Sequence, residues 1–207
     1  MAAIGTRGVW ARFVRWMHPK AQDQPVVPTA FETERLTLRP LGLKDAPELH
    51  LALTESVNEL REYLWHVPWI AEEQTLSSAQ SRCKDALENF QSHKDFAYLA
   101  FAKSTGRLVG SVGLHRPDWA LRTTEVGYWV RSSEAGRGYA SEMVNAITPL
   151  ALGAFGVDRV ELVTDERNAA SRKVAERCGF SLECVTPQID KHEDGVERSN
   201  CVYVKSN

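Results

Sequence analysis

Residues 125–143 join a strand-like run to a helix-prone segment through two glycines spaced G-x-G. The stretch reads EVGYWVRSSEAGRGYASEM, and its turn contains Gly136 and Gly138. At such a junction, unpaired N–H groups and the positive end of the helix dipole attract phosphate and other anions. The same glycines also suit a plain strand–turn–helix connection, because a lone G-x-G is a weak signal. Both interpretations stay open on this stretch alone.

Cysteine and metal chemistry are not indicated. The four cysteines, Cys83, Cys178, Cys184 and Cys201, lie far apart without a C-x-x-C pair, so neither a zinc site nor a disulfide framework is expected. A reducing cytoplasm is the simplest setting. Cys178 and Cys184 fall at apolar-patterned positions, which predicts core thiols rather than nucleophiles.

Composition limits the classes of protein to consider. The chain has 207 residues, 43% hydrophobic and 25% charged, with a net charge of −2. These values are typical of one globular domain with a well-filled core. The charge argues against a nucleic-acid binder that works by phosphate neutralisation. No apolar run approaches the roughly 20 residues that a transmembrane helix needs.

Residues 1–30 differ from the rest and are predicted to form a basic amphipathic extension and linker. Four basic residues precede the first acidic one, and apolar residues recur at helical spacing before Pro25 and Pro28. The segment suits a helix that lies on a membrane or packs on the domain, a transit-like segment, or a mobile extension without a role. Residues 31–207 are predicted to form the domain.

The elements of this domain follow from periodicity and punctuation. Strands are predicted at 34–41, 96–103, 107–114, 125–131, 159–164, 180–186 and 196–204. Helices are predicted at 45–54, 56–64, from 76 onward, at 138–154 and at 169–177. The order predicts an α/β (α+β) fold with a mixed, mostly antiparallel sheet in one domain. A nucleotide-binding Rossmann domain is excluded because the glycine turn comes late and after antiparallel-type strands.

Local signals set the expected helix ends. Asp45 with Glu48, and Ser56 with Glu59, have the spacing of capping boxes, and Thr75 suits an N-cap. Gly179 suits a left-handed position after a helix. Pro149 is expected to kink or shorten the helix at 138–154.

Seven motifs occur in an order that resembles a known family. The chain is similar to the GNAT superfamily of acetyl-CoA-dependent N-acetyltransferases, in the RimJ/RimL-like branch that includes ribosomal-protein N-terminal acetyltransferases. The motifs span about residues 31–204 and read RLTLRPL, YLWHVPW, LVGSVGL, EVGYWV, GRGYASE, RVELVT and NAASRKVAERCGF.

The resemblance implies a sheet that splays between strands 125–131 and 159–164, with helices on both faces and acetyl-CoA as co-substrate. The pantetheine arm would lie in the gap and bond the strand edge near Val130 and Arg131. The pyrophosphate would be held by backbone N–H groups of Gly136, Arg137, Gly138, Tyr139 and Ala140. The family loop is often written Q/R-x-x-G-x-G/A, and Ser133 departs from its first position, which weakens any side-chain role there.

Two residues after strand 159–164 gain roles from the resemblance. Asn168 would bond the pantetheine arm, and Ser171 would lie beside the cofactor sulfur and protonate the leaving thiolate. Many relatives use a tyrosine as that acid. Alternatively, Asn168 is only a good N-cap and Ser171 an ordinary serine of the first turn.

The base is assigned less directly. Acetyl transfer needs a neutral amine and a stabilised oxyanion. Glu125 can draw a proton away through water, and Asp190 aligns with an acidic residue given a base role in the ribosomal-protein branch. Either can instead be a solvated carboxylate. An α-amine with a pKa near 8 needs less help from a base than a lysine with a pKa near 10.4.

Trp65 and Trp69 are expected either to line the acceptor pocket or to be core aromatics. Tyr128 and Trp129 must point to opposite faces of their strand. The expected function is acetyl transfer from acetyl-CoA to a primary amine by direct attack in a ternary complex. A protein N-terminal α-amine is the first choice, a small-molecule amine the second, and a non-catalytic CoA-binding module the third. We expect a monomer or homodimer.

Overall fold

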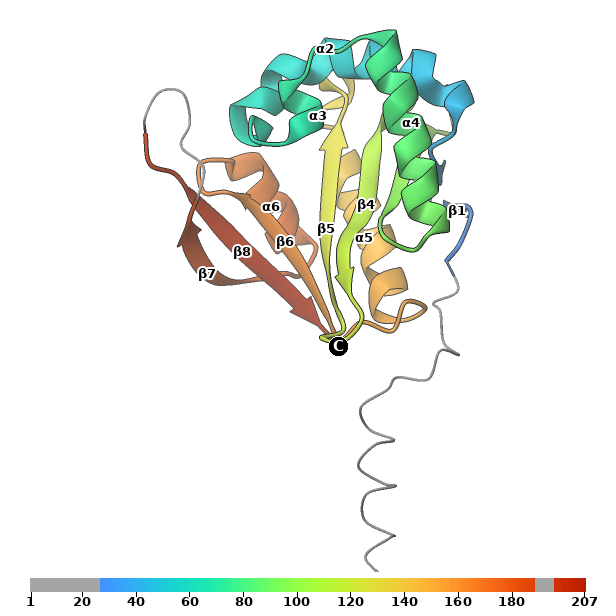
Figure 1. Cartoon of the computed structure of the whole chain (residues 1–207). Coiled ribbons are helices and arrows are strands. Elements are labelled where there is room, and N and C mark those ends of the chain that lie inside the picture. Colours follow the sequence, from blue (N-terminus) through green and yellow to red (C-terminus); the bar gives the residue numbers. More distant parts are fainter. Residues whose placement is uncertain (1–26, 189–195) are drawn as a thin grey trace, which may run out of the picture.

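Eight strands form one sheet in the order β1-β2-β3-β4-β5-β6-β8-β7 in the computed structural model, which describes residues 27–188 and 196–207 (Figure 1). Neighbouring strands pair antiparallel except β5 and β6, which are parallel. The predicted mixed, mostly antiparallel sheet is therefore confirmed. The strands are β1 (Phe31–Glu32), β2 (Leu36–Pro40), β3 (Phe96–Ala102), β4 (Leu108–Asp118), β5 (Thr123–Val130), β6 (Arg159–Asp165), β7 (Ser181–Pro187) and β8 (Ser199–Ser206).

Helices cover both faces of this sheet, as expected. In Figure 1, α2 and α3 lie across the upper ends of β4 and β5 and α4 runs along the near side of the sheet to their right, while α5 lies behind. One buried cluster joins α5 and α6 to the sheet, and a second joins α2 and α4 to its other face. Among the described residues, none of the helices has the length and apolar character of a membrane span. The helices are α2 (Ala46–Leu64), α3 (Pro68–Ala71), α4 (Leu76–Gln91), α5 (Tyr139–Leu152) and α6 (Ala169–Arg177), with short 3-10 turns η1 (Leu43–Asp45) and η2 (Ser132–Glu134).

The sheet opens between β5 and β6. These strands pair only from Thr123↔Arg159 to Glu125↔Glu161, and beyond that point they diverge into a V that is clear in Figure 1. The predicted splay between the two central strands is confirmed. It leaves one edge of β5 without a neighbouring strand over residues 126–130.

The prediction of two short helices at 45–54 and 56–64 is wrong, because α2 runs through both. Asp45 makes no side-chain cap. Its carboxylate instead accepts from Arg39 at 2.7 and 2.6 Å. Ser56 is fully buried in the middle of α2, and its hydroxyl donates to the carbonyl of Ala52. The predicted helix start at Asp45 is therefore confirmed, although without a capping bond from its side chain, whereas Ser56 starts no helix because it lies inside α2.

The predictions for Thr75 and Gly179 at helix ends are confirmed. Thr75 caps α4 through the N–H of Ser78 at 3.0 Å, and Gly179 has a φ of 77° after α6. Pro149 lies inside the last turn of α5, which ends at Leu152. Of the two cysteines expected in the core, Cys178 is buried, whereas Cys184 is exposed on the edge strand β7 and that prediction is wrong.

The predicted basic extension falls mostly on residues 1–26, which lie outside the described residues, and its nature stays a prediction. At the end of that segment, Val27 packs against the core cluster behind the sheet. The carbonyl of Pro28 accepts a hydrogen bond from the Tyr98 hydroxyl at 2.9 Å. The last linker residues are therefore held against the domain.

Candidate functional site

A cavity of ≈ 1090 Å³ fills the gap between β5 and β6 and continues beneath α2, α3 and α4. It brings together most of the residues that the sequence singled out, namely Trp69, Glu125, Val130, Gly136, Gly138, Tyr139, Ala140, Asn168 and Ser171. Trp65, Arg131 and Arg137 are not among its lining residues. Asp190 lies outside the described residues.

The turn before α5 has the geometry of an anion cradle. Gly136 and Gly138 adopt φ angles of 75° and 80°, in the left-handed region that favours glycine. Gly138 is the N-cap of α5 and supplies no side-chain cap. The N–H groups of the first helical turn are therefore left for a ligand, at the positive end of the helix dipole. A Cβ on Gly136 would meet nothing within 4 Å, so the space above the turn is open.

Helix α2 holds the entrance to this turn. Arg131, whose side chain is only 9% exposed, pairs with Glu48 at 2.8 Å and with Glu55 at 2.7 Å. The hydroxyl of Ser56 accepts from the N–H of Ser132 at 3.0 Å, and Glu55 accepts from the N–H of Ser133 at 2.9 Å. Because both serine amides are bound to α2, the chain enters the glycine turn along a fixed path.

These hydrogen bonds also favour the ionised form of the Glu55 carboxylate. A hydrogen bond from the Ser133 hydroxyl lowers the pKa of Glu55 to about 2, with help from Arg131 and against the opposing effect of burial. Ser133, the position that departs from the family pattern, thus contributes to the loop by bonding α2.

Arg35 supports the turn from the other side. Its guanidinium donates to the carbonyl of Arg137 at 3.0 Å and pairs with Glu142 of α5 at 2.5 Å. The same group lies 4.6 Å from the centre of the Tyr139 ring. The side chain of Arg137 turns to Glu134 at 3.0 Å, so its contribution to a bound anion would come from its backbone.

The free edge of β5 is presented by Val130 and Tyr128. The N–H of Arg131 donates to Val109 of β4, and its carbonyl accepts from Glu134. Since backbone groups alternate along a strand, those of Val130 and Tyr128 point away from β4 and into the gap. This favours Val130 and Tyr128 over Arg131 as edge partners of a ligand.

Ser171 and Tyr128 meet across the gap. Their hydroxyl oxygens are 2.9 Å apart. Burial raises the pKa of Tyr128 to about 12, although the bond to Ser171 acts in the opposite direction. Asn168 caps α6 through its Oδ1, which accepts from the N–H of Ser171 at 2.9 Å. The cap fixes Ser171, and the shared bond places two proton donors at one point of the cavity.

Glu125 lies at the narrow end of the gap, where its carboxylate pairs with Arg116. On the neighbouring strand, His115 lines the same cavity and its Nδ1 lies 2.7 Å from Oδ2 of Asp95. Within the described residues, no three His, Cys, Asp or Glu side chains group as a metal site would require.

Sequence reasoning missed His115 and Asp95. The imidazole lies over two glycines, and a Cβ on Gly113 or Gly127 would come within 2.7 and 2.8 Å of the ring. Gly113 is two residues from His115, but Gly127 becomes its neighbour only through the register of β4 and β5. The motif GSVGLH supplied a signal for the first contact, and no local pattern supplied the second.

Helices α3 and α4 contribute Trp69 and Arg82 to the cavity wall on which the sequence predicted the acceptor to bind. Trp69 lines the cavity, and the guanidinium carbon of Arg82 lies 3.2 Å from its ring centre. Trp65 is partly buried and packs edge-on against His66. Trp129 is buried in the front cluster, while Tyr128 packs on the opposite face, which confirms their expected divergence.

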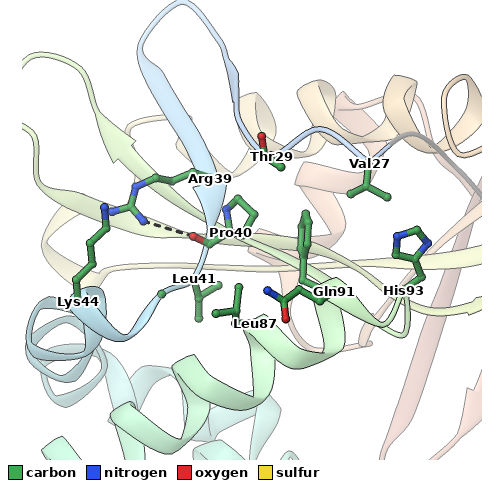
Figure 2. A pocket seen from close by; sticks show the side chains of 11 residues that line it. Val27, Thr29, Arg39, Pro40, Leu41, Lys44, Leu87, Gln91 and His93 are labelled. Carbon is green, nitrogen blue, oxygen red and sulfur yellow. Dashed lines mark hydrogen bonds between the residues drawn. The ribbon is translucent and has the colours of Figure 1, made fainter.

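A second, smaller hollow of ≈ 540 Å³ lies by the start of the described chain and the end of α4 (Figure 2). Leu41, Leu87 and Phe90 are among its apolar lining residues, and Arg39 and His93 line it as well. None of the predicted site residues lines it. The larger cavity is therefore the candidate active site.

Comparison with known proteins settles the family. A family model described as the acetyltransferase (GNAT) domain matches residues 35–181. The chain belongs to the GNAT acetyltransferases. It is accordingly an acetyl-CoA-dependent N-acetyltransferase, as the motifs predicted.

Individual GNAT relatives match this chain over most of their own length. The uncharacterised N-acetyltransferase YoaA of Bacillus subtilis (strain 168) is 26% identical over 172 residues, covering 83% of this chain and 93% of the relative. The ribosomal-protein-serine acetyltransferase of Escherichia coli (strain K12) is 23% identical over 166 residues, covering 77% and 93%. The second relative supports the expected likeness to the RimJ/RimL-like branch.

A solved GNAT structure has the same fold. The microcin C7 self-immunity acetyltransferase MccE, in complex with acetyl-CoA and AMP, superposes with a TM-score of 0.77 at 25% identity. The match covers 88% of this chain and 99% of that one. A bound acetyl-CoA in a protein of this fold agrees with the amide cradle and open strand edge described above.

Proposed function

We propose that this enzyme acetylates the α-amine at the N-terminus of a protein. The observation that carries the proposal is the Tyr128–Ser171 pair, which lines the same cavity as the amide cradle and Trp69. The ribosomal-protein-serine acetyltransferase among its relatives gives the acceptor class. A small-molecule amine is the second candidate.

The residues present fit acetyl-CoA as co-substrate. The backbone N–H groups of residues 136–140 suit its pyrophosphate, because they are unpaired donors at a helix N-terminus. The free edge of β5 at Val130 suits the amide-containing arm, and Asn168 stands beside it at the start of α6. When bound, acetyl-CoA supplies the thioester carbonyl that the amine attacks.

Proton movements follow from the side chains at the gap. The neutral amine forms a C–N bond as the C–S bond breaks, and the leaving thiolate needs a proton. Ser171 delivers that proton, and Tyr128 supports its hydroxyl through their shared bond. N–H groups at the β5 edge receive the oxyanion. No covalent enzyme intermediate is required.

The proton lost by the amine passes to a base that lines the same cavity. His115, held by Asp95, is our first choice, because its ring lines the cavity over Gly127 of β5. Glu125 can act through water, although Arg116 already pairs with it. Asp190 is retained as the candidate that the family resemblance indicates.

The test is acetylation of a panel. Protein and acetyl-CoA are incubated with N-terminal peptides and with small amines, and thiol release is followed. We expect turnover on peptide α-amines and little on lysine side chains, since an amine with a pKa near 8 is partly neutral at working pH. Turnover on small amines alone would favour the second candidate. Absence of turnover on every amine, despite tight CoA binding, would leave a silent CoA-binding module.

The cellular setting and assembly are part of the proposal. Cys83, Cys178, Cys184 and Cys201 are all free thiols, which supports a reducing, cytoplasmic setting. We propose a monomer or homodimer.

A further inference from the structure

The acceptor wall of the cavity contains buried donors that the protein does not satisfy. Arg82 of α4 and Trp129 of β5 both line the cavity. The Nη1 of Arg82 and the Nε1 of Trp129 are shielded from solvent and have no hydrogen-bond partner within the described part of the chain. A buried donor without an acceptor keeps the penalty of its lost hydration without regaining a hydrogen bond. Two of them in one cavity call for a ligand that accepts hydrogen bonds.

The charge of Arg82 is also unbalanced. Three acidic residues on the cavity wall have cationic partners, namely Glu125 with Arg116, Glu134 with Arg137 and Asp165 with Arg167. A fourth, Glu59 of α2, also lines the cavity and is exposed to solvent, and no ion pair joins it to Arg82 among the described residues. Arg82 instead stacks on Trp69. Burial lowers the pKa of Arg82 to about 9, although the nearby charge of Asp95 acts in the opposite direction. A guanidinium stays charged in proteins, so this group awaits an anion.

This anion is distinct from the phosphates of the co-substrate. The amide cradle belongs to α5, which packs behind the sheet, whereas Arg82 comes from α4 on the front face. Trp69 and Trp129 belong to the same front cluster. The unpaired Nη1 of Arg82 therefore lies on the cavity wall to which we assign the amine acceptor.

Resting on the proposed function, we propose that the acceptor carries a carboxylate near its amine and that Arg82 binds it. The planar guanidinium matches a carboxylate, and the N–H of Trp129 supplies a further donor. The carboxylate can belong to an acidic residue that follows a protein N-terminus or to a small amino acid. An aspartate or glutamate beside the reacting amine is the shared chemistry.

Equilibrium binding to the protein–CoA complex tests this without relying on turnover. The probes are the tetrapeptide amides Ser-Asp-Gly-Gly and Ser-Asn-Gly-Gly, together with free aspartate and asparagine amide, titrated by calorimetry. Wild type should bind the acidic member of at least one pair about tenfold more tightly or better, the strength of a hydrogen bond to a charged group. Preference within the peptide pair indicates a protein acceptor, and preference within the amino-acid pair a small molecule.

Variants locate the effect. Arg82→Gln should abolish the acidic preference and leave binding of the neutral probe within twofold, while Arg82→Lys should keep part of the preference. Lys84→Gln is the matched control, because Lys84 lies on the same helix with its side chain 68% exposed. Trp129→Phe should reduce the preference by a few-fold and serves as a second variant should Arg82→Gln fail to fold.

Equal binding of both members of each pair, or an equal loss for both with Arg82→Gln, overturns the subsite. Turnover separates this from the proposed function. Acetylation of the neutral peptide by Arg82→Gln would leave the enzyme function standing, whereas acidic preference in binding without turnover on any amine would contradict only the function.

Discussion

The hydroxyl oxygens of Tyr128 and Ser171 lie 2.9 Å apart, one on β5 and the other on α6, across the gap where the sheet opens. The positions of both side chains follow from the elements that carry them. Strand alternation sends Tyr128 to the α6 side, and the Asn168 cap fixes Ser171 in the first turn of its helix. The pair therefore places a second hydroxyl group, that of Tyr128, beside the serine predicted from the sequence.

Ser171→Ala should lower kcat by roughly 100-fold, the lower range for a positioned general acid. Tyr128→Phe should cause a smaller loss, because Ser171 keeps its hydroxyl. The double variant should be little worse than Ser171→Ala, since both act through one proton path. KM for acetyl-CoA should change less than twofold. Steady-state kinetics decide, with Ser92→Ala at the end of α4 as control; additive losses would mean separate roles.

Gly136→Glu should abolish CoA binding, because the new carboxylate would occupy the space proposed for the pyrophosphate. The φ of Gly136 is 75°, which also disfavours any side chain at this position. Gly106→Glu is the matched control. Gly106 has a φ of 69° and equally open surroundings, but lies in the turn between β3 and β4. Calorimetry should detect CoA affinity only in the control. Unchanged affinity in Gly136→Glu would contradict the cradle.

Ser56→Ala should lower the free energy of unfolding by about 1–3 kcal/mol, because the N–H of Ser132 loses its buried acceptor, the Ser56 hydroxyl. For a chain of this size that corresponds to roughly 2–4 °C in Tm per kcal/mol. CoA affinity should fall as well, since Ser132 leads into the glycine turn. Thermal melts and calorimetry give both quantities, and Ser77→Ala on the exposed face of α4 is the control. A stability loss without weaker CoA binding would mean that the loop keeps its shape unaided.

Glu55 should make folding sensitive to acid. Its folded pKa is about 2, below the ordinary value of 4.5. The contribution is fully present above pH 4.5 and is lost as pH falls from 4.5 toward 2. Glu55→Gln should therefore shrink the difference in urea midpoint between pH 7 and pH 3, whereas exposed Glu73→Gln should not. An unchanged difference would show that Glu55 titrates normally.

His115→Asn should lower kcat by about 100-fold if the imidazole accepts the amine proton. Asp95→Asn should lower kcat less, because Asp95 orients the ring without touching the acceptor. His50→Asn on α2 is the control, since His50 bonds only locally with Thr54 among its described contacts. Full activity of His115→Asn would return the base role to Asp190 or Glu125, and the corresponding alanine variants then discriminate between them.

Sequence patterns predicted what depends on near neighbours. Gly136 and Gly138 were recognisable because a strand, two glycines and a helix follow one another directly. Ser56 was misjudged because its capping-box spacing is also a local pattern, while its actual partner, Ser132, is distant in the chain.

The same limit explains what the sequence missed in the site. Arg82 and Trp69 stand on different helices, and His115 gains Gly127 as a neighbour only through strand register. A buried donor without a hydrogen-bond partner, such as the Nη1 of Arg82, cannot be recognised from the types of residue in the sequence.

The short pairing of β5 with β6 has a consequence for stability. Three residue pairs are all that join the strand ladder of the first five strands to that of the last three. A pantetheine arm hydrogen-bonded along β5 would fill the position of the missing strand in this ladder. Saturating CoA should therefore protect the backbone amides of β5 and β6 from hydrogen exchange together. With the arm placed as we propose, loading of the co-substrate and the cohesion of the two sheet halves would be one event.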